Sequence, residues 1–273
     1  MKNFLVLCLL SVLISQTFAG NLSPRDAIKV CSKESEKKPY FTETGHLNTT
    51  YKIATIAGRP FDAKALAYFS QYPDEDKEFD AIRNAIKNKI PFISDDLSQA
   101  AVRKLHSLHG GDQDIILARR KSLELAIQRN LESSSNIWKA GLLIHAYGDT
   151  FAHTKGKFGS QDEKAFGPFS GHLFHSIFQD DPDNILVGDA RVKYTAFVKD
   201  LFNVLKTNDA DKNALQDYIT KAENTNCKTD SCFKREVLGV QEFLGFSKFN
   251  SCMDANMKPL SNNQVLDVLN QIQ

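Results

Sequence analysis

The sequence lacks several features that mark particular classes of protein. After its N-terminal segment it has no apolar run near the roughly 20 residues that a transmembrane helix needs. Its 34 basic and 33 acidic residues leave a formal net charge of +1, so the basic excess typical of nucleic-acid or anionic-membrane proteins is missing. Repeats and low-complexity tracts are also missing. Any affinity for phosphate must therefore come from a local site.

Cysteine is scarce, with five in 273 residues. Cys8 falls in the N-terminal segment, which leaves Cys31, Cys227, Cys232 and Cys252. An even number in an exported chain favours disulfide bonds, and sequence alone permits three pairings. The short CKTDSC segment could close a small loop, in which case the other two cysteines would join the N-terminal and C-terminal segments. A zinc site made of thiolates is the alternative, but the paired C-x-x-C spacing is absent.

The N-terminal segment has the pattern of a secretory signal peptide. Lys2 is followed by an apolar run over residues 4–14, and small residues lead up to Ala19. The apolar run is too short to span a bilayer. We therefore predict that residues 1–19 are a signal peptide and that residues 20–273 form an exported protein, either secreted or periplasmic.

Strand signals are weak along the whole chain, whereas helix signals are frequent. Apolar residues recur at spacings of three and four, with Ser, Asp or Asn before the runs and Gly or Pro after them. A loop-rich region with several glycines spans residues 154–189. A hydrophobic share of 42% can build a sizeable core, and nothing marks a domain boundary. We predict an all-α fold in which residues 20–273 form a single multi-helix domain.

Local signals place the ends of several helices. Pro73 is expected to end an early helix. Asp112 is expected to begin a long amphipathic one, and the serines at 133–135 to cap the next, which covers residues 136–153.

This last helix contains the stretch HAYGDTFAH, which carries the strongest functional signal. It places His145, Asp149 and His153 at intervals of four in an otherwise apolar helix. At about 100° per residue, the three side chains share one face. Eight residues rise about 12 Å, so the two histidines cannot bind the same ion, whereas Asp149 between them could bridge neighbouring ions.

Buried unpaired polar groups on such a helix would cost several kcal/mol, and bound cations would remove that cost. The alternative is a polar face that simply meets solvent. Three groups in register just before a glycine-rich loop favour metal binding. Single histidines and acids elsewhere are weaker candidates, because helix dipoles, caps and solvated loops also use them. These further candidates are His46, His106, His109, His172, His175, Asp74, Asp76, Asp180, Asp181 and Asp183.

The order of these residues resembles that of the zinc-dependent phospholipase C and single-strand-nuclease superfamily. The segments FTETGH, HAYGDTFAHT and GHLFHSIFQDDPD are similar to a bacterial branch with an H-x-x-[GA]-D-x-x-A-H helix followed by a G-H and P-D loop. The match covers roughly residues 40–185, and the helix motif is its specific part. The resemblance implies an all-α fold of the zinc-dependent phospholipase C type, with two or three zinc ions in a cleft.

The resemblance also implies a ligand for each ion. Asp149 would bridge two ions and, with Asp74, is implied to be catalytic. The implied ligands are Asp74, His109 and His145 for one ion, His46 for a second, and His153, His172 and Asp183 for a third. Three of these positions have alternatives, namely His106 for His109, Asp76 for Asp74, and Asp181 or His175 for Asp183.

Two departures from the superfamily stand out. Well-known members begin with a zinc-binding tryptophan, whereas the only tryptophan here, Trp138, lies inside a predicted helix. The gap between Asp149 and His153 is also shorter than in those members.

These features together predict a secreted zinc phospholipase C, which cleaves glycerophospholipids to diacylglycerol and a phosphorylated headgroup. Clustered zinc ions ionise a shared water near neutral pH and stabilise the leaving oxygen. A neutral chain with 19 phenylalanines fits a lipid better than a nucleic acid, so we expect a monomer acting on phospholipid at a membrane surface, with no stable nucleic-acid partner. The alternatives are a secreted single-strand-type nuclease and, because the N-terminal tryptophan is missing, a non-catalytic exported metal-binding or toxin module.

Overall fold

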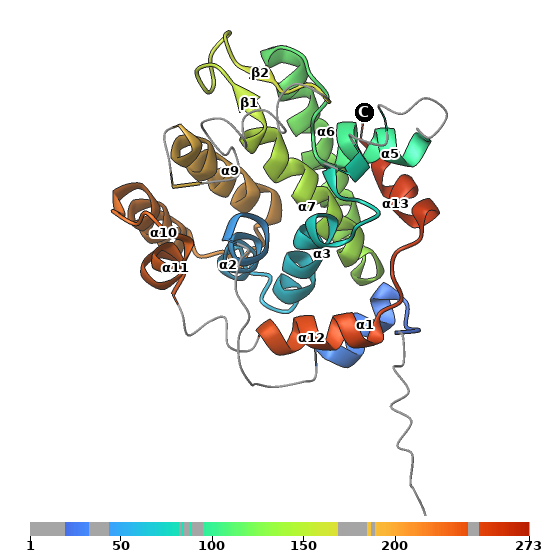
Figure 1. Cartoon of the computed structure of the whole chain (residues 1–273). Helices are drawn as coiled ribbons and strands as arrows, with labels where there is room; N and C mark the ends of the chain where they lie inside the picture. The colour runs from blue at the N-terminus through green and yellow to red at the C-terminus, as the bar shows by residue number, and fades with distance from the viewer. Residues whose placement is uncertain are drawn as a thin grey trace, which may run out of the picture.

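A computed structural model of the chain shows a mainly helical architecture, which confirms the all-α prediction (Figure 1). The residues it describes are 20–32, 44–81, 83–84, 88, 95–168, 185–186, 189–239 and 246–272. The predicted signal peptide lies outside them. None of the described helices is both long and apolar enough to cross a membrane.

The described helices follow one another with short connections. The α-helices are α1 (Pro24–Cys31), α2 (Thr49–Ile56), α3 (Ala63–Glu75), α5 (Asp96–Ala100), α6 (Gln113–Leu131), α7 (Ile137–Ala152), α9 (Ala190–Leu205), α10 (Lys212–Asn224), α11 (Asp230–Phe233), α12 (Phe246–Asn256) and α13 (Asn262–Leu269). Four short turns of π or 3-10 type are η1 (Thr44–Asn48), η2 (Ala101–Leu105), η3 (Ser134–Asn136) and η4 (Lys234–Gly239). Two short antiparallel strands, β1 (Thr154–Lys155) and β2 (Lys164–Ala165), form a hairpin after α7.

Helix α7 lies at the centre of the molecule, packed against α3, α6 and α9 (Figure 1). Nearly all of its residues are buried, as its apolar sequence predicts. Gly141 allows α3 to approach closely, because a Cβ at this position would lie 2.5 Å from the Cβ of Phe69. The most buried helix of the fold is thus the one that carries the HAYGDTFAH stretch.

The helix ends agree with the sequence in two cases and differ in one. Asp112 caps α6 as predicted, with its side chain accepting a hydrogen bond from the backbone of Ile115. Helix α7 begins at Ile137, close to the predicted start. The prediction that Pro73 ends its helix is wrong, since α3 continues through Pro73 to Glu75. This extra turn brings Asp74 onto a helix.

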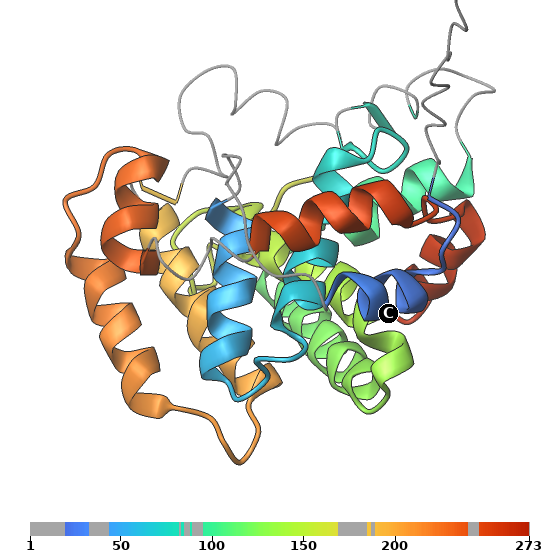
Figure 2. The same cartoon turned by 90° about the horizontal axis from the view of Figure 1, so that it is seen from below.

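Two disulfide bonds cross-link the described chain. Cys31–Cys252 joins α1 to α12, which lie side by side (Figure 2), and Cys227–Cys232 closes the loop between α10 and α11. Their Cα–Cα distances are 5.5 and 5.4 Å, in the normal range. Of the three possible pairings, this is the one in which the CKTDSC segment closes on itself. The bonds are compatible with an oxidising compartment.

The C-terminal segment contacts two of the elements around α7. The Tyr72 hydroxyl, near the end of α3, accepts a hydrogen bond from the backbone N–H of Leu260 at 3.1 Å. The ammonium group of Lys104, in η2, donates to the backbone carbonyls of Leu269 and Ile272 at 3.1 and 3.0 Å. Residues 260–272 therefore brace both α3 and η2.

Candidate metal centre

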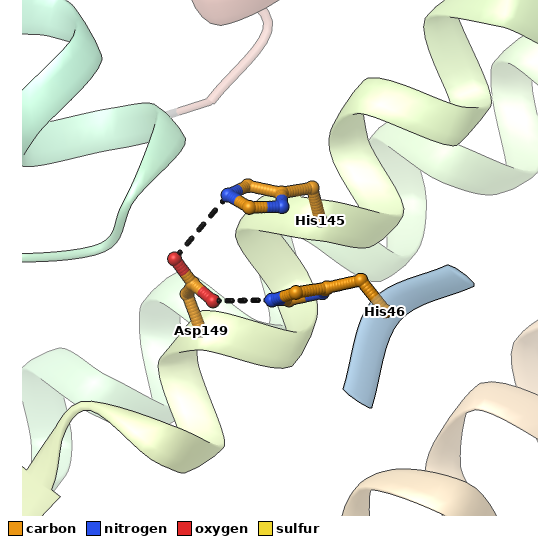
Figure 3. Close-up of side chains that lie close together, drawn as sticks. All are labelled: His46, His145 and Asp149. Atoms are coloured by element: carbon orange, nitrogen blue, oxygen red, sulfur yellow. Dashed lines mark ion pairs between the residues drawn. The ribbon is translucent and has the colours of Figure 1, made fainter. Parts of the chain in front are cut away.

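Histidine and aspartate side chains from four elements meet beside α7. We call these five residues the His/Asp cluster: His46 from η1, Asp74 from the last turn of α3, His106 directly after η2, and His145 and Asp149 from α7. The four-residue spacing on α7 puts the last two side chains on one face, as predicted. Figure 3 shows the Asp149 carboxylate reaching the rings of both His145 and His46.

Asp149 is the centre of the cluster and is only 2% exposed. Its Oδ1 lies 3.0 Å from Nε2 of His46. Its Oδ2 lies 3.4 Å from both Nδ1 of His106 and Nε2 of His145. Within the described part of the chain, Oδ2 has no hydrogen-bond partner. A buried carboxylate oxygen of this kind is costly unless a cation neutralises it.

Asp74 closes the other side of the same space. Its Oδ1 lies 3.9 Å from Nδ1 of His106 and 3.8 Å from Nε2 of His145, and these two nitrogens are 3.1 Å apart. In a tetrahedral site with bonds of 2.0–2.1 Å, ligand atoms are separated by about 3.3–3.4 Å. The distances around Oδ2 of Asp149 and Oδ1 of Asp74 therefore fit one ion held by four side chains.

Two three-residue groups in the described chain could hold a metal ion. One is His46, His145 and Asp149, and the other is Asp74, His106 and His145; the ligand atoms of each group all lie within 4.8 Å of one another. Both groups use His145, and one imidazole nitrogen binds one ion. The consistent arrangement gives His145 to the group with Asp74, and leaves Oδ1 of Asp149 and Nε2 of His46 to begin a second position.

Backbone carbonyls fix which nitrogen of each ring faces the cluster. Nε2 of His106 donates to the carbonyl of Phe79 at 2.8 Å, so Nδ1 faces inward without a proton. Nδ1 of His145 donates to the carbonyl of Ser70 at 2.9 Å, which leaves Nε2 as the ligand atom. Such outer hydrogen bonds orient metal-binding histidines in general.

Burial and charge set the protonation of the cluster. Burial opposes the charge of Asp149, but the neighbouring His153 and His145 hold the pKa of this carboxyl well below its usual range. Burial lowers the pKa of His145 to about 4. Burial also works against the charge of His106, but its hydrogen bond to Asp149 and the charge of that carboxylate raise its pKa overall. A carboxylate beside a neutral imidazole is the form that binds a metal.

The structure brings His106 into the cluster, where the resemblance had favoured His109. His109 lies outside both groups, with its Nδ1 2.5 Å from the carbonyl of Gly110. The cause is Ser107, whose φ of +50° turns the backbone directly after His106. The Ser107 hydroxyl donates to the carbonyl of Ala146 on α7 at 2.8 Å, which fixes this turn against the helix.

Of the two acids at the end of α3, Asp74 faces the cluster. Asp76 accepts a hydrogen bond from the Tyr72 hydroxyl at 2.7 Å and belongs to neither group.

His153 lies at the edge of the cluster. It is the first residue after α7, and its Nδ1 lies 2.7 Å from the carbonyl of His106 and 3.6 Å from Oδ2 of Asp149. It is a member of neither three-residue group. Its predicted co-ligands His172 and Asp183, like the alternatives His175 and Asp181, lie outside the described residues, so the third ion stays a prediction.

Two residues of the site had no role in the sequence analysis. Ser107 is one of them. The other is Gly148, where a Cβ would lie 3.1 Å from Cε1 of His46, so that a side chain here would press on the ring. Glycine in the motif could have signalled such a close approach, whereas the backbone turn at Ser107 leaves no mark in the sequence.

No protein-family model matches this chain, and neither the curated proteins nor the solved structures include a significant match to it. Function is therefore inferred from the His/Asp cluster itself.

Proposed function

We propose that the His/Asp cluster binds zinc and that the protein is a secreted zinc-dependent phosphodiesterase of the phospholipase C type. The observation that carries this proposal is the environment of Asp149. Its buried Oδ2 lies 3.4 Å from two imidazole nitrogens and has no hydrogen-bond partner in the described chain. A cation at this point would neutralise the carboxylate and use the inward-facing nitrogens of His106 and His145.

The donor set favours zinc over the common alternatives. Two imidazoles and two carboxylates suit zinc, whereas magnesium and calcium prefer oxygen ligands. Side-chain exposure differs across the cluster, from 0% at His145 to 18% at His46 and 39% at Asp74. One side of the cluster is thus open to solvent, and catalytic zinc sites in general keep a position open for water or substrate.

Zinc bound in such a cluster supplies a water that ionises near neutral pH and a Lewis acid for the phosphoryl oxygens. The side chains of the protein hold the parts in place. Asp149 connects the two positions through its two carboxylate oxygens. Asp74 is the exposed carboxylate, and its Oδ2 accepts a long hydrogen bond from Gln71 at 3.4 Å. This oxygen is the atom placed to receive a proton from an attacking water.

Phospholipid is the substrate that we propose, because the chain is nearly neutral and no nucleic-acid groove is evident from its charge. The diacylglycerol-releasing reaction follows from the resemblance noted above. A nuclease of the same superfamily and a non-catalytic metal-binding module are the outcomes against which it is tested.

Metal analysis combined with a phosphodiesterase assay tests the proposal. The wild type should contain two or more zinc ions per chain and hydrolyse a chromogenic phosphocholine diester, and the activity should disappear with a chelator and return with zinc. Asp149→Asn should lose zinc and activity, whereas Asp217→Asn, at an exposed position of α10, should keep both. Full activity after thorough zinc removal would contradict the proposal. Nucleotide release from single-stranded DNA without phosphocholine release would select the nuclease, and one tightly held ion without hydrolysis would select the module.

A further inference from the structure

A small hairpin begins directly at the edge of the His/Asp cluster. Strand β1 starts at Thr154, next to His153, and the backbone N–H of Phe166, just after β2, donates to the carbonyl of His153 at 2.9 Å. Thr154 and Ala165 pair across the hairpin, and both are buried. The hairpin is therefore a direct extension of the chain that carries the cluster.

The outer face of the hairpin carries an unusual charge arrangement. Lys155 and Lys164 pair directly across the two strands, and both are exposed. Directly opposed like charges destabilise a strand pair. Lys157, in the loop between them, is also exposed. In the described part of the chain none of the three lysines forms an ion pair, and Asp162 is the exposed acid of the same loop.

The inner side of the hairpin is held firmly on α7, so the lysines have a fixed place. Arg120 on α6 pairs with the fully buried Glu163 at 3.1 Å and donates to the carbonyl of Thr150 at 2.8 Å. Its guanidinium lies 4.0 Å from the centre of the Phe151 ring and 5.3 Å from that of Phe158. The acid that could have neutralised the outer lysines is thus used on the inside.

The surroundings of the hairpin fit a lipid surface better than a nucleic acid. Binding of single strands depends on aromatic rings that are free to stack on bases. Phe158, the aromatic residue of the hairpin loop, is instead packed against Arg120 and Phe151. Next to β2, Ile115 is 48% exposed and lies beside Gly111, whose carbonyl accepts a hydrogen bond from Ala165. Lysines beside an exposed aliphatic side chain are typical of proteins that dock on anionic membranes.

We propose that Lys155, Lys157 and Lys164 form a docking surface for membranes that contain anionic phospholipids. The proposal deepens the proposed function and rests on it for its purpose, because docking here would bring lipid headgroups to the chain segment next to the cluster. The unpaired lysine charges are then neutralised by the lipid phosphates rather than by the protein.

Vesicle sedimentation of the full mature chain, with chelator present to prevent hydrolysis, tests this docking surface. The wild type should bind vesicles of mixed phosphatidylcholine and phosphatidylserine more tightly than pure phosphatidylcholine vesicles, and added salt should weaken the binding. The triple variant Lys155→Gln, Lys157→Gln and Lys164→Gln should bind the mixed vesicles more weakly by a factor on the order of 100. Its melting temperature should stay the same or rise, because an opposed like-charge pair is removed.

A matched control removes three exposed lysines elsewhere, with the changes Lys206→Gln, Lys212→Gln and Lys221→Gln. This control should bind mixed vesicles like the wild type. Equal losses in both triple variants, no loss in the hairpin variant, or no binding by the wild type would overturn the docking surface. Lysine-dependent binding to single-stranded DNA in place of vesicles would overturn it as well. Since binding is measured without zinc, its failure is distinct from a failure of the hydrolase assay.

Discussion

The substitution Asp149→Asn tests the central feature of the structure, because it replaces a buried carboxylate by an amide of the same shape. Both carboxylate oxygens face candidate ligand partners, Oδ1 at 3.0 Å from His46 and Oδ2 at 3.4 Å from His106 and His145. The amide keeps the volume but loses the negative charge and one of the two oxygens. Packing should therefore change little, while both metal positions lose a ligand.

The expected effect can be stated as a metal-dependent stability. At a zinc concentration of about 100 times the dissociation constant, binding stabilises the wild type by about 2.7 kcal/mol. For a chain of this size, that corresponds to a rise in melting temperature of about 5–10 °C. Changes to groups outside the ligand shell already weaken metal binding by about 10–100-fold, so loss of a shared ligand should weaken it by at least about 100-fold. At the same zinc concentration the variant would gain only about 0.4 kcal/mol, a rise of about 1 °C.

Thermal unfolding with chelator and with increasing zinc measures both values, and Asp217→Asn serves as the matched control at an exposed helix position. The control should show the full wild-type response. If Asp149→Asn keeps the zinc-dependent rise, or if the wild type shows none, the carboxylate is not at a metal position and the reasoning fails.

Three further substitutions test the surroundings of the site. Ser107→Ala removes the hydrogen bond that fixes the turn after the cluster histidine; it should cost about 1 kcal/mol of stability and weaken zinc binding roughly 10-fold, and an unchanged zinc titration would count against a positioning role. Glu163→Gln leaves Arg120 buried without its counter-charge and should lower the free energy of unfolding by about 3 kcal/mol in urea; a loss below about 1 kcal/mol would mean that solvent reaches the pair. Changing both Cys31 and Cys252 to alanine opens a cross-link between residues 221 positions apart and should cost about 4 kcal/mol, whereas an unchanged unfolding midpoint would show that the cross-link constrains little.

The part of the site on α7 could be predicted from the sequence because one helix contains all the information needed. A spacing of four residues on an apolar helix puts His145 and Asp149 on one face, whatever the rest of the fold does. The helical class was equally accessible, since capping residues and apolar periodicity recur along the chain. These are local properties, and local properties survive in the tertiary structure.

The contributions from other elements were less accessible, because they depend on how the backbone turns. The spacing of His106 and His109 at the end of a helix does not show which ring points inward, and the left-handed backbone at Ser107 decides it. The position of Asp74 depends on α3 continuing past Pro73, against the usual effect of proline. His46 comes from a distant segment, and its place beside Gly148 follows only from tertiary packing.

The bracing contacts of residues 260–272 have a consequence for when the site can form. Leu260 holds the end of α3 through Tyr72, and Leu269 and Ile272 hold η2 through Lys104. The last residues to leave the ribosome thus secure two segments that supply ligands made much earlier. Loading with metal is then a late event in maturation, and a protease that trims the tail would disarm the centre without touching a single ligand.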